Sequence, residues 1–153
     1  MKQLKLTLLF LVVNFAGLAI GSWTMNDGPI SDWYIHLNQA PWTPPGVVFG
    51  IAWTSIMVCF SIYLGKLFSR ENSTKNALIF LFQFTLNVSW NFIFFNQHLV
   101  FLGLITIVFL TVILFIYFFK YSKNLGNYKY LLLPYMIWLC IATSLNLYIL
   151  VNN

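Results

Sequence analysis

Five uncharged, mostly apolar runs of about 20 residues divide this chain, and each is long enough to cross a lipid bilayer. Helices satisfy every backbone hydrogen bond internally, which a segment in hydrocarbon requires. We therefore predict an all-α integral membrane protein, a bundle of five transmembrane helices that forms a single domain over residues 1–153. The predicted spans are residues 6–25, 46–65, 77–95, 99–119 and 130–151, with residues 26–45 as a lid loop.

The composition agrees with a lipid environment, since 60% of the residues are hydrophobic and only 7% are charged. An ordinary soluble domain is about half apolar and about a quarter charged. Lys2 and Lys5 before an apolar run also fit a signal peptide. The uncharged stretch continues to residue 26, however, so we expect a retained first helix.

The basic residues predict the orientation of the bundle. All eight fall into three segments that five spans place on one side, whereas Asp27, Asp32 and the turn at 96–98 fall on the other. The excess of Lys and Arg in cytoplasmic loops predicts a multi-pass protein of the cell membrane, with a cytoplasmic N-terminus and an outside C-terminus. The basic residues are too dispersed to indicate a nucleic-acid partner; they are Lys2, Lys5, Lys66, Arg70, Lys75, Lys120, Lys123 and Lys129.

The connections carry local signals of their own. Ser31 can cap a short helix that carries Trp33 and Tyr34, and we expect this helix to lie on the outer face as a lid. Thr43 is predicted to cap the second span, with Pro44 at its first position. The short segment 96–98 predicts an antiparallel hairpin of the third and fourth spans.

Polar side chains recur on one face of the third span, with spacings of three and four residues. Because an amide in hydrocarbon is costly without partners, this stripe should face the bundle interior. Hydrogen bonding between helices and ligand binding both remain open as its role. The stripe comprises Gln83, Asn87, Trp90 and Asn91.

Aromatic residues mark two other spans. Trp53 and Trp138, with small residues nearby, can line a flat apolar slot in which their N–H groups orient a ligand. Plain packing is the alternative for such aromatic stripes. The residues on these faces are Phe49, Gly50, Trp53 and Met57 in one span, and Tyr135, Trp138, Ala142 and Asn146 in the other.

The spans contain no Asp, Glu, Lys, Arg or His, which argues against ion-coupled transport. The sequence shows no catalytic pair and no metal cluster, so neither a metal site nor a required cofactor is predicted. We expect Cys59 and Cys140 to be inert thiols within apolar stretches. His36 and His98 lie in loops, where a surface histidine is favoured over a haem ligand.

Several motifs in order resemble the tryptophan-rich sensory protein family, also called translocator proteins or peripheral benzodiazepine receptors. They are WYIHLNQAPWTPPGVVFGIAW at 33–53, QFTLNVSWNFIFF at 83–95 and LLLPYMIWLCIATSLN at 131–146. Animal members place a cholesterol-recognition motif at the end of the fifth span, but here no Lys or Arg follows Tyr148. The chain is therefore similar to the bacterial type.

The resemblance implies a five-helix fold, often dimeric, with a pocket closed by the first loop. Members bind porphyrins, haem and synthetic benzodiazepine-site ligands there. By resemblance, Trp53 and Trp138 are the candidates for light-dependent porphyrin breakdown. The predicted ligand-binding residues are Tyr34, Trp53, Asn87, Trp90, Trp138, Ala142 and Asn146.

Three functional hypotheses follow. The leading one is a carrier or sensor that binds porphyrin- or haem-type tetrapyrroles, or another flat hydrophobic molecule, beside membrane lipid. The second is light- and oxygen-dependent porphyrin degradation, with the photochemistry supplied by the porphyrin and no conventional enzyme machinery. The third is a carrier of lipid or small hydrophobic molecules, or a non-catalytic membrane partner protein.

Gly17 and Gly21 in the first span have a spacing that lets two helices approach closely. They can pack against a neighbouring span of the same chain or against a second copy. Packing within the chain is favoured for these glycines. The family resemblance nevertheless predicts a homodimer, and the glycine spacing makes the first span the candidate for its interface.

Overall fold

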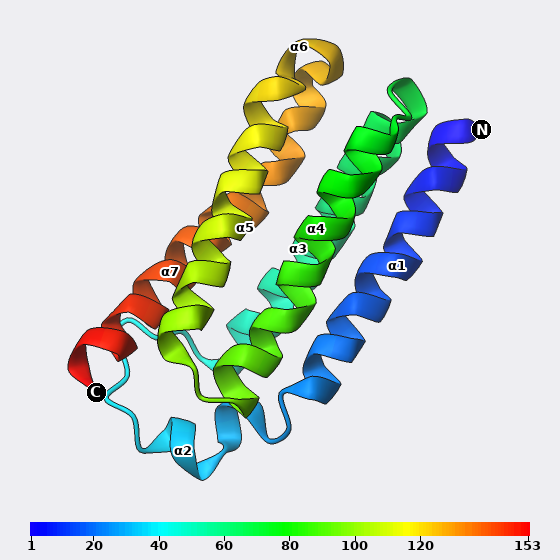
Figure 1. Ribbon diagram of the computed structural model, residues 1–153. Helices are drawn as coiled ribbons and strands as arrows, with labels where there is room; N and C mark the ends of the chain where they lie inside the picture. Colours follow the sequence, from blue (N-terminus) through cyan, green and yellow to red (C-terminus); the bar gives the residue numbers. More distant parts are fainter.

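The structure is a computed structural model that describes the backbone of residues 1–153 and every side chain except that of Ser122. Within this described chain, five helices are long and apolar enough to cross a membrane, which confirms the predicted all-α membrane fold. They stand side by side in a bundle (Figure 1). These helices are α1 (Lys2–Thr24), α3 (Gly46–Arg70), α4 (Thr74–Asn91), α5 (Val100–Lys120) and α7 (Leu133–Asn152).

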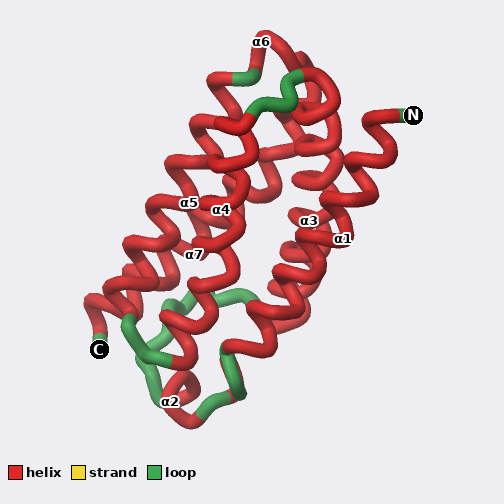
Figure 2. The backbone as a smooth tube through the Cα atoms, turned by 45° about the vertical axis from the view of Figure 1, so that its right-hand side comes forward, coloured by secondary structure: helices red, strands yellow, loops and turns green.

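Short elements occupy the two ends of the bundle. Figure 2 shows that the non-helical backbone gathers at these ends. The connection between α1 and α3 forms a 3₁₀ turn, η1 (Gly28–Ile30), and a single helical turn, α2 (Asp32–Ile35). A π-helical turn, Phe92–Asn96, prolongs α4. At the other end, α6 (Ser122–Leu125) and the 3₁₀ helix η3 (Gly126–Leu132) lead into α7.

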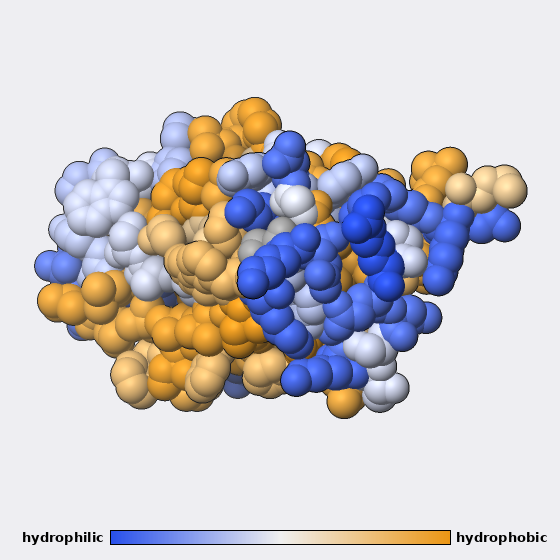
Figure 3. All heavy atoms as spheres, turned by 90° about the horizontal axis from the view of Figure 1, so that it is seen from above, coloured by the Kyte–Doolittle hydropathy of each residue, from blue (hydrophilic) through white to orange (hydrophobic). Residues whose placement is uncertain are grey.

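The N-terminus, the α3–α4 connection and α6 lie at one end, and α2 and the C-terminus lie at the other (Figure 1). We call these the basic end and the lid end, because the eight Lys and Arg residues belong to the first group of segments. Figure 3 views the basic end, where hydrophilic residues gather beside apolar ones. The assignment of this end to the cytoplasm stays a prediction.

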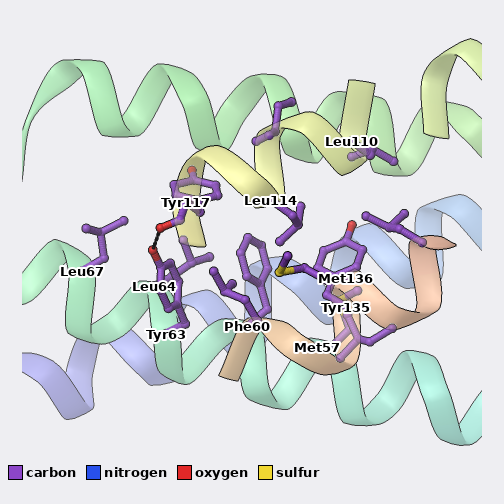
Figure 4. Close-up of a cluster of buried hydrophobic side chains, with 14 of the residues drawn as sticks. Met57, Phe60, Tyr63, Leu64, Leu67, Leu110, Leu114, Tyr117, Tyr135 and Met136 are labelled. Atoms are coloured by element: carbon purple, nitrogen blue, oxygen red, sulfur yellow. Dashed lines mark hydrogen bonds between the residues drawn. The ribbon is translucent and has the colours of Figure 1, made fainter. Parts of the chain in front are cut away.

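The best-packed part of the bundle is its basic half. Tyr63, Leu114 and Tyr117 are completely buried there, where α3 and α5 meet α7 (Figure 4). The Tyr63 hydroxyl donates to the Tyr117 backbone oxygen at 3.0 Å. Aromatic and aliphatic side chains thus fill the interior of this half.

Helix α1 approaches α3 closely at Gly65. A Cβ atom on Gly65 would lie 2.8 Å from the Thr7 backbone nitrogen and 2.9 Å from the Thr7 Cα. One turn toward the lid end, the Asn14 amide donates to the Ser61 hydroxyl at 2.8 Å. Ser61 in turn donates to the Met57 backbone oxygen, so this buried polar contact is satisfied and ties the two helices together.

The paired glycines of α1 pack inside the chain. A Cβ atom on Gly17 would lie 2.5 Å from the Phe84 ring, and one on Gly21 would lie 2.6 Å from the Asn91 amide nitrogen. Both neighbours belong to α4, so this face is covered within the monomer. Of the two alternatives that the glycine spacing left open, packing within the chain is the one observed. A homodimer stays a prediction.

The predicted helix starts were right in one place and wrong in another. The Ser31 hydroxyl accepts the Tyr34 backbone N–H at 3.3 Å, as predicted for the short lid helix. Thr43 does not cap the second span, because α3 begins at Gly46 with Pro45 at the capping position. A residue before proline disfavours the helical conformation, and both Thr43 and Pro44 precede a proline.

Candidate functional site

The lid half of the bundle contains a cavity of about 460 Å³ between the long helices and under the 26–45 connection. This volume falls within the range of about 300–1,000 Å³ that is usual for small-molecule sites. The cavity brings together all of the side chains predicted to bind a ligand, which are Tyr34, Trp53, Asn87, Trp90, Trp138, Ala142 and Asn146. That they bind a ligand stays a prediction.

Aromatic rings at the inner end of the cavity hold one another in edge-to-face contact. Trp53 packs on Tyr135, with ring centroids 6.0 Å apart and planes at 69°. Phe49 packs on Trp138, with centroids 5.0 Å apart and planes at 89°. Such contacts favour fixed ring orientations. The two predicted indoles therefore stand on different helices, each supported by a neighbouring ring.

The polar stripe of α4 divides between two roles. Gln83 is 2% exposed and donates through Nε2 to the Tyr135 hydroxyl at 3.0 Å. The Tyr135 hydroxyl donates onward to Asn87 Oδ1 at 2.8 Å. Asn87, Trp90 and Asn91 line the cavity, whereas Gln83 is absent from the described lining and joins α4 to α7. Hydrogen bonding between helices is thus observed for Gln83 and Asn87, whereas ligand binding by the cavity-lining part of the stripe stays a prediction.

Two polar groups in the cavity wall are buried without a partner. Both amide atoms of Asn146 lack a hydrogen bond to any described residue, and so does the Trp90 indole N–H. Asn146 is only 2% exposed. Most buried polar groups in proteins are paired, because an unpaired one forfeits its hydration. These groups are therefore the polar atoms of the cavity wall that a ligand or a water molecule could satisfy, and binding of a ligand there stays a prediction.

The lid covers the outer end of the cavity and is held there by ring contacts. Trp33 stacks on His98, with centroids 4.0 Å apart and planes at 12°, and meets Phe94 edge-on at 5.6 Å. Tyr34 lines the cavity and packs edge-on against Phe95 at 5.2 Å. Burial raises the pKa of the Tyr34 phenol, so this side chain is neutral at physiological pH.

A second set of contacts fastens the lid to the end of α7. The Asn38 backbone N–H donates to Asn153 Oδ1 at 2.9 Å, and the Asn38 side chain donates to the Asn152 backbone oxygen at 3.0 Å. The Trp42 indole N–H donates to the Ser144 hydroxyl at 3.2 Å. We call the Asn38–Asn152–Asn153 contact the lid latch. Sequence reasoning missed it, because a polar pair over 100 residues apart carries no periodic signal.

The described lining is uncharged, since it includes no Asp, Glu, Lys, Arg or His. Its polar groups are amides, hydroxyls and indole N–H groups, and its bulk is aromatic and aliphatic. The two loop histidines lie elsewhere, with His36 exposed and His98 against Trp33. Such a wall can bind and orient a largely apolar guest, but it supplies no group for acid–base chemistry at neutral pH.

Comparison with known proteins covers nearly the whole chain. Residues 9–151 match the model of the TspO/MBR family. A tryptophan-rich protein TspO of Archaeoglobus fulgidus is 30% identical over 100% of this chain and 99% of its own length. One from Chlorobaculum tepidum is 28% identical over 95% of this chain and 91% of its own length. A tryptophan-rich sensory protein of Cereibacter sphaeroides is 30% identical, over 75% and 73%.

Proposed function

The chain belongs to the TspO/MBR family of membrane proteins, and from that premise we propose that it binds porphyrin- or haem-type tetrapyrroles in the cavity under its lid, as a carrier or sensor. The observation that carries the proposal is that the predicted ligand-binding side chains meet in one cavity. Seven side chains chosen from the sequence line one cavity of about 460 Å³, although they come from the lid and three different helices.

The apolar part of a tetrapyrrole suits the aromatic wall. A porphyrin is a flat plate, and binding it gains free energy roughly in proportion to the apolar surface removed from water. Trp53, Trp138 and Phe49 offer rigid ring surfaces at the inner end of the cavity. Rings held by edge contacts lose little conformational freedom when the plate enters, which favours affinity.

The polar edges of the plate need partners as well. Asn87 and Asn146, together with the Trp90 N–H, supply neutral hydrogen-bonding groups around the cavity. Because the described lining contains no cation, an ionised propionate gains no ion pair there. We therefore expect moderate affinity, which suits a protein that takes up and releases its ligand.

A matched pair of variants tests the proposal. Added porphyrin should give a shifted Soret band with the wild-type protein in mild detergent. The double variant Trp53→Phe, Trp138→Phe should weaken binding, because it removes two cavity-lining indoles. Trp23→Phe is the control, since Trp23 is 82% exposed and lies outside the cavity. Undiminished affinity in the double variant would remove the basis for the assignment.

A carrier of lipid or of small hydrophobic molecules is the alternative, because an uncharged apolar cavity also suits such ligands. It predicts that purified protein neither carries nor acquires a Soret band, while lipid copurifies in fixed ratio. Porphyrin breakdown, by contrast, would need light and oxygen, since the described lining offers no acid–base group. Breakdown at the same rate in darkness would exclude that photochemical role.

A further inference from the structure

We propose that Asn146, together with Trp90, forms a subsite for an uncharged ligand group that carries a hydrogen-bond donor and an acceptor side by side. A carboxamide, a lactam or a protonated carboxylic acid has this edge. The inference rests on the proposed function and deepens it, because it names the part of the ligand that the cavity recognises.

The environment of Asn146 leaves its amide buried and unpaired at the cavity wall. Asn146 lies on the cavity wall, is 2% exposed, and has no partner for Nδ2 or Oδ1 within the described structure. Gly103 of α5 makes room beside it, because a Cβ atom there would lie 3.1 Å from Asn146 Nδ2 and 3.2 Å from the Phe94 ring. The amide is thus held between α5 and α7 without being satisfied by either.

Trp90 adds a donor in the same neighbourhood. Its ring stacks on Phe94, with centroids 5.1 Å apart and planes at 10°. Phe94 also borders the space above Gly103, where the Asn146 amide lies. The Trp90 indole N–H is buried and unpaired among the described side chains. One face of the cavity therefore offers an amide donor, an amide acceptor and an indole donor.

The unpaired oxygen and nitrogen of the Asn146 amide determine which ligand group it binds best. Such an amide forms two parallel hydrogen bonds with a group that presents a donor next to an acceptor. A carboxylate presents acceptors only, and leaves Asn146 Oδ1 unpaired. It would also be buried without a cation, since the described lining includes none. The subsite thus favours an uncharged donor–acceptor edge over an ionised one.

Asn87 on α4 provides a contrast on the same wall. Its Oδ1 accepts the Tyr135 hydroxyl at 2.8 Å, so its amide nitrogen is left to meet a ligand. The Tyr135 hydroxyl is itself fixed by the donor Gln83 Nε2. Because Asn87 Oδ1 already accepts one hydrogen bond, Asn87 meets a ligand mainly through its N–H donors, and it should discriminate little between an amide edge and an ester.

The test uses three porphyrins of one skeleton, with propionic acid, methyl ester or carboxamide side chains. The wild-type protein should bind the carboxamide at least about tenfold more tightly than the ester, because the ester leaves Asn146 Oδ1 unpaired. Carboxamide affinity should not depend on pH. Affinity for the acid should fall as the pH rises through its carboxyl pKa, which is about 4.3 for the chemically similar Glu side chain, because the neutral form binds better.

Two variants assign the effect to its residue. Asn146→Leu should bring the carboxamide-to-ester ratio close to one. Asn87→Leu, the matched control, should weaken all three ligands while preserving the ratio. The ligand-free Asn146→Leu protein should be at least as thermally stable as wild type, because an unpaired buried amide has been replaced by an apolar group.

Each contrary outcome has a distinct meaning. Equal wild-type affinity for ester and carboxamide, with a normal Soret shift, overturns the subsite and leaves the proposed function standing. Failure of all three porphyrins to bind overturns the proposed function itself. An unchanged preference in Asn146→Leu means that water satisfies the amide, and a large loss of thermal stability means that protein does. Either result overturns the subsite.

Discussion

The same five helices build two unlike halves. In the basic half, Tyr63, Leu67 and Tyr117 have no exposed surface, and α1 touches α3 at backbone distance beside Gly65. In the lid half, the helices stand around a cavity of about 460 Å³ whose wall includes the unpaired amide of Asn146. Packing is dense where the chain carries no candidate site and open where it does.

The difference shows how a membrane bundle can hold an unfavourable site. Lipid gives little hydrophobic drive between helices, so stability comes from close packing and hydrogen bonds. The basic half supplies both, through its buried tyrosines and through the Asn14–Ser61 contact near the middle of α1 and α3. The lid half can then retain a void and unpaired polar groups at a cost that the rest of the bundle offsets.

The largest effect should come from forcing the packed half apart. Gly65→Val places side-chain atoms where the Thr7 backbone already lies within 3 Å of a simple Cβ. Backbone on both sides cannot yield as a flexible side chain can, so we expect a loss of about 3 kcal/mol or more. Thermal unfolding in mild detergent measures it. A variant with wild-type stability would show that the α1–α3 approach is not tight.

Filling the cavity should weaken ligand binding and leave thermal stability almost unchanged, unlike the Gly65 substitution. Ala142 lines the cavity from α7, and Ala142→Phe adds a ring to the space that the porphyrin needs. We expect affinity to fall by about 100-fold, equivalent to about 2.7 kcal/mol, while thermal stability stays near wild type. Soret titration and thermal unfolding of the same preparation separate the two effects. A joint loss of both would mean that the cavity is part of the packed core.

The sequence predicted the membrane spans, which depend on average hydropathy. It did not predict the helix cap or the helix packing, which depend on individual contacts. The five spans follow from long uncharged runs, whose helical state lipid enforces. The Thr43 cap failed because consecutive prolines impose their own backbone geometry beyond the cap preference. The role of Gly17 stayed open in the sequence because only three-dimensional packing reveals that Phe84 covers it.

The site was predictable to a similar depth. Helical spacing placed Asn87, Trp90 and Asn91 on one interior face, and the family resemblance singled out Trp53 and Trp138. The hydrogen-bond chain from Gln83 through Tyr135 to Asn87 was not predictable, because it depends on the relative rotation of α4 and α7. The lid latch was missed as well, because it joins segments more than 100 residues apart and such a pair leaves no periodic signal in the sequence.

A smaller effect should follow from opening the lid latch. The double variant Asn38→Ala, Asn153→Ala removes the side-chain hydrogen bonds between the lid and the end of α7. We expect porphyrin release to accelerate about five- to tenfold, because exposed hydrogen bonds contribute about 1 kcal/mol in total, with little change in thermal stability. Stopped-flow Soret measurements give the rate.

Asn152→Ala is the matched control for the latch. Asn152 contributes only its backbone oxygen to the bond with Asn38, while its side chain bonds Tyr148 within α7. The Asn152→Ala variant should therefore release porphyrin at the wild-type rate. Equal acceleration in the control and the double variant would point to fraying of the helix end rather than to loss of the latch.

The smallest predicted effect concerns Gly50, which the same helix α3 carries in its lid half. No described atom lies within 4 Å of a Cβ built there, in contrast with Gly65 in the basic half. Gly50→Ala should therefore raise the free energy of unfolding by about 0.5–1 kcal/mol, because alanine restricts the unfolded backbone and meets no obstacle. Porphyrin affinity should not change, since Gly50 lies outside the described cavity lining.

A destabilised variant would require atoms over Gly50 that the monomer lacks, and a shift from dimer to monomer in the same variant would identify them as a second copy of this chain. If Gly50→Ala is stabilised while Gly65→Val is destabilised, the close helix contacts along α3 lie in the basic half and not at Gly50.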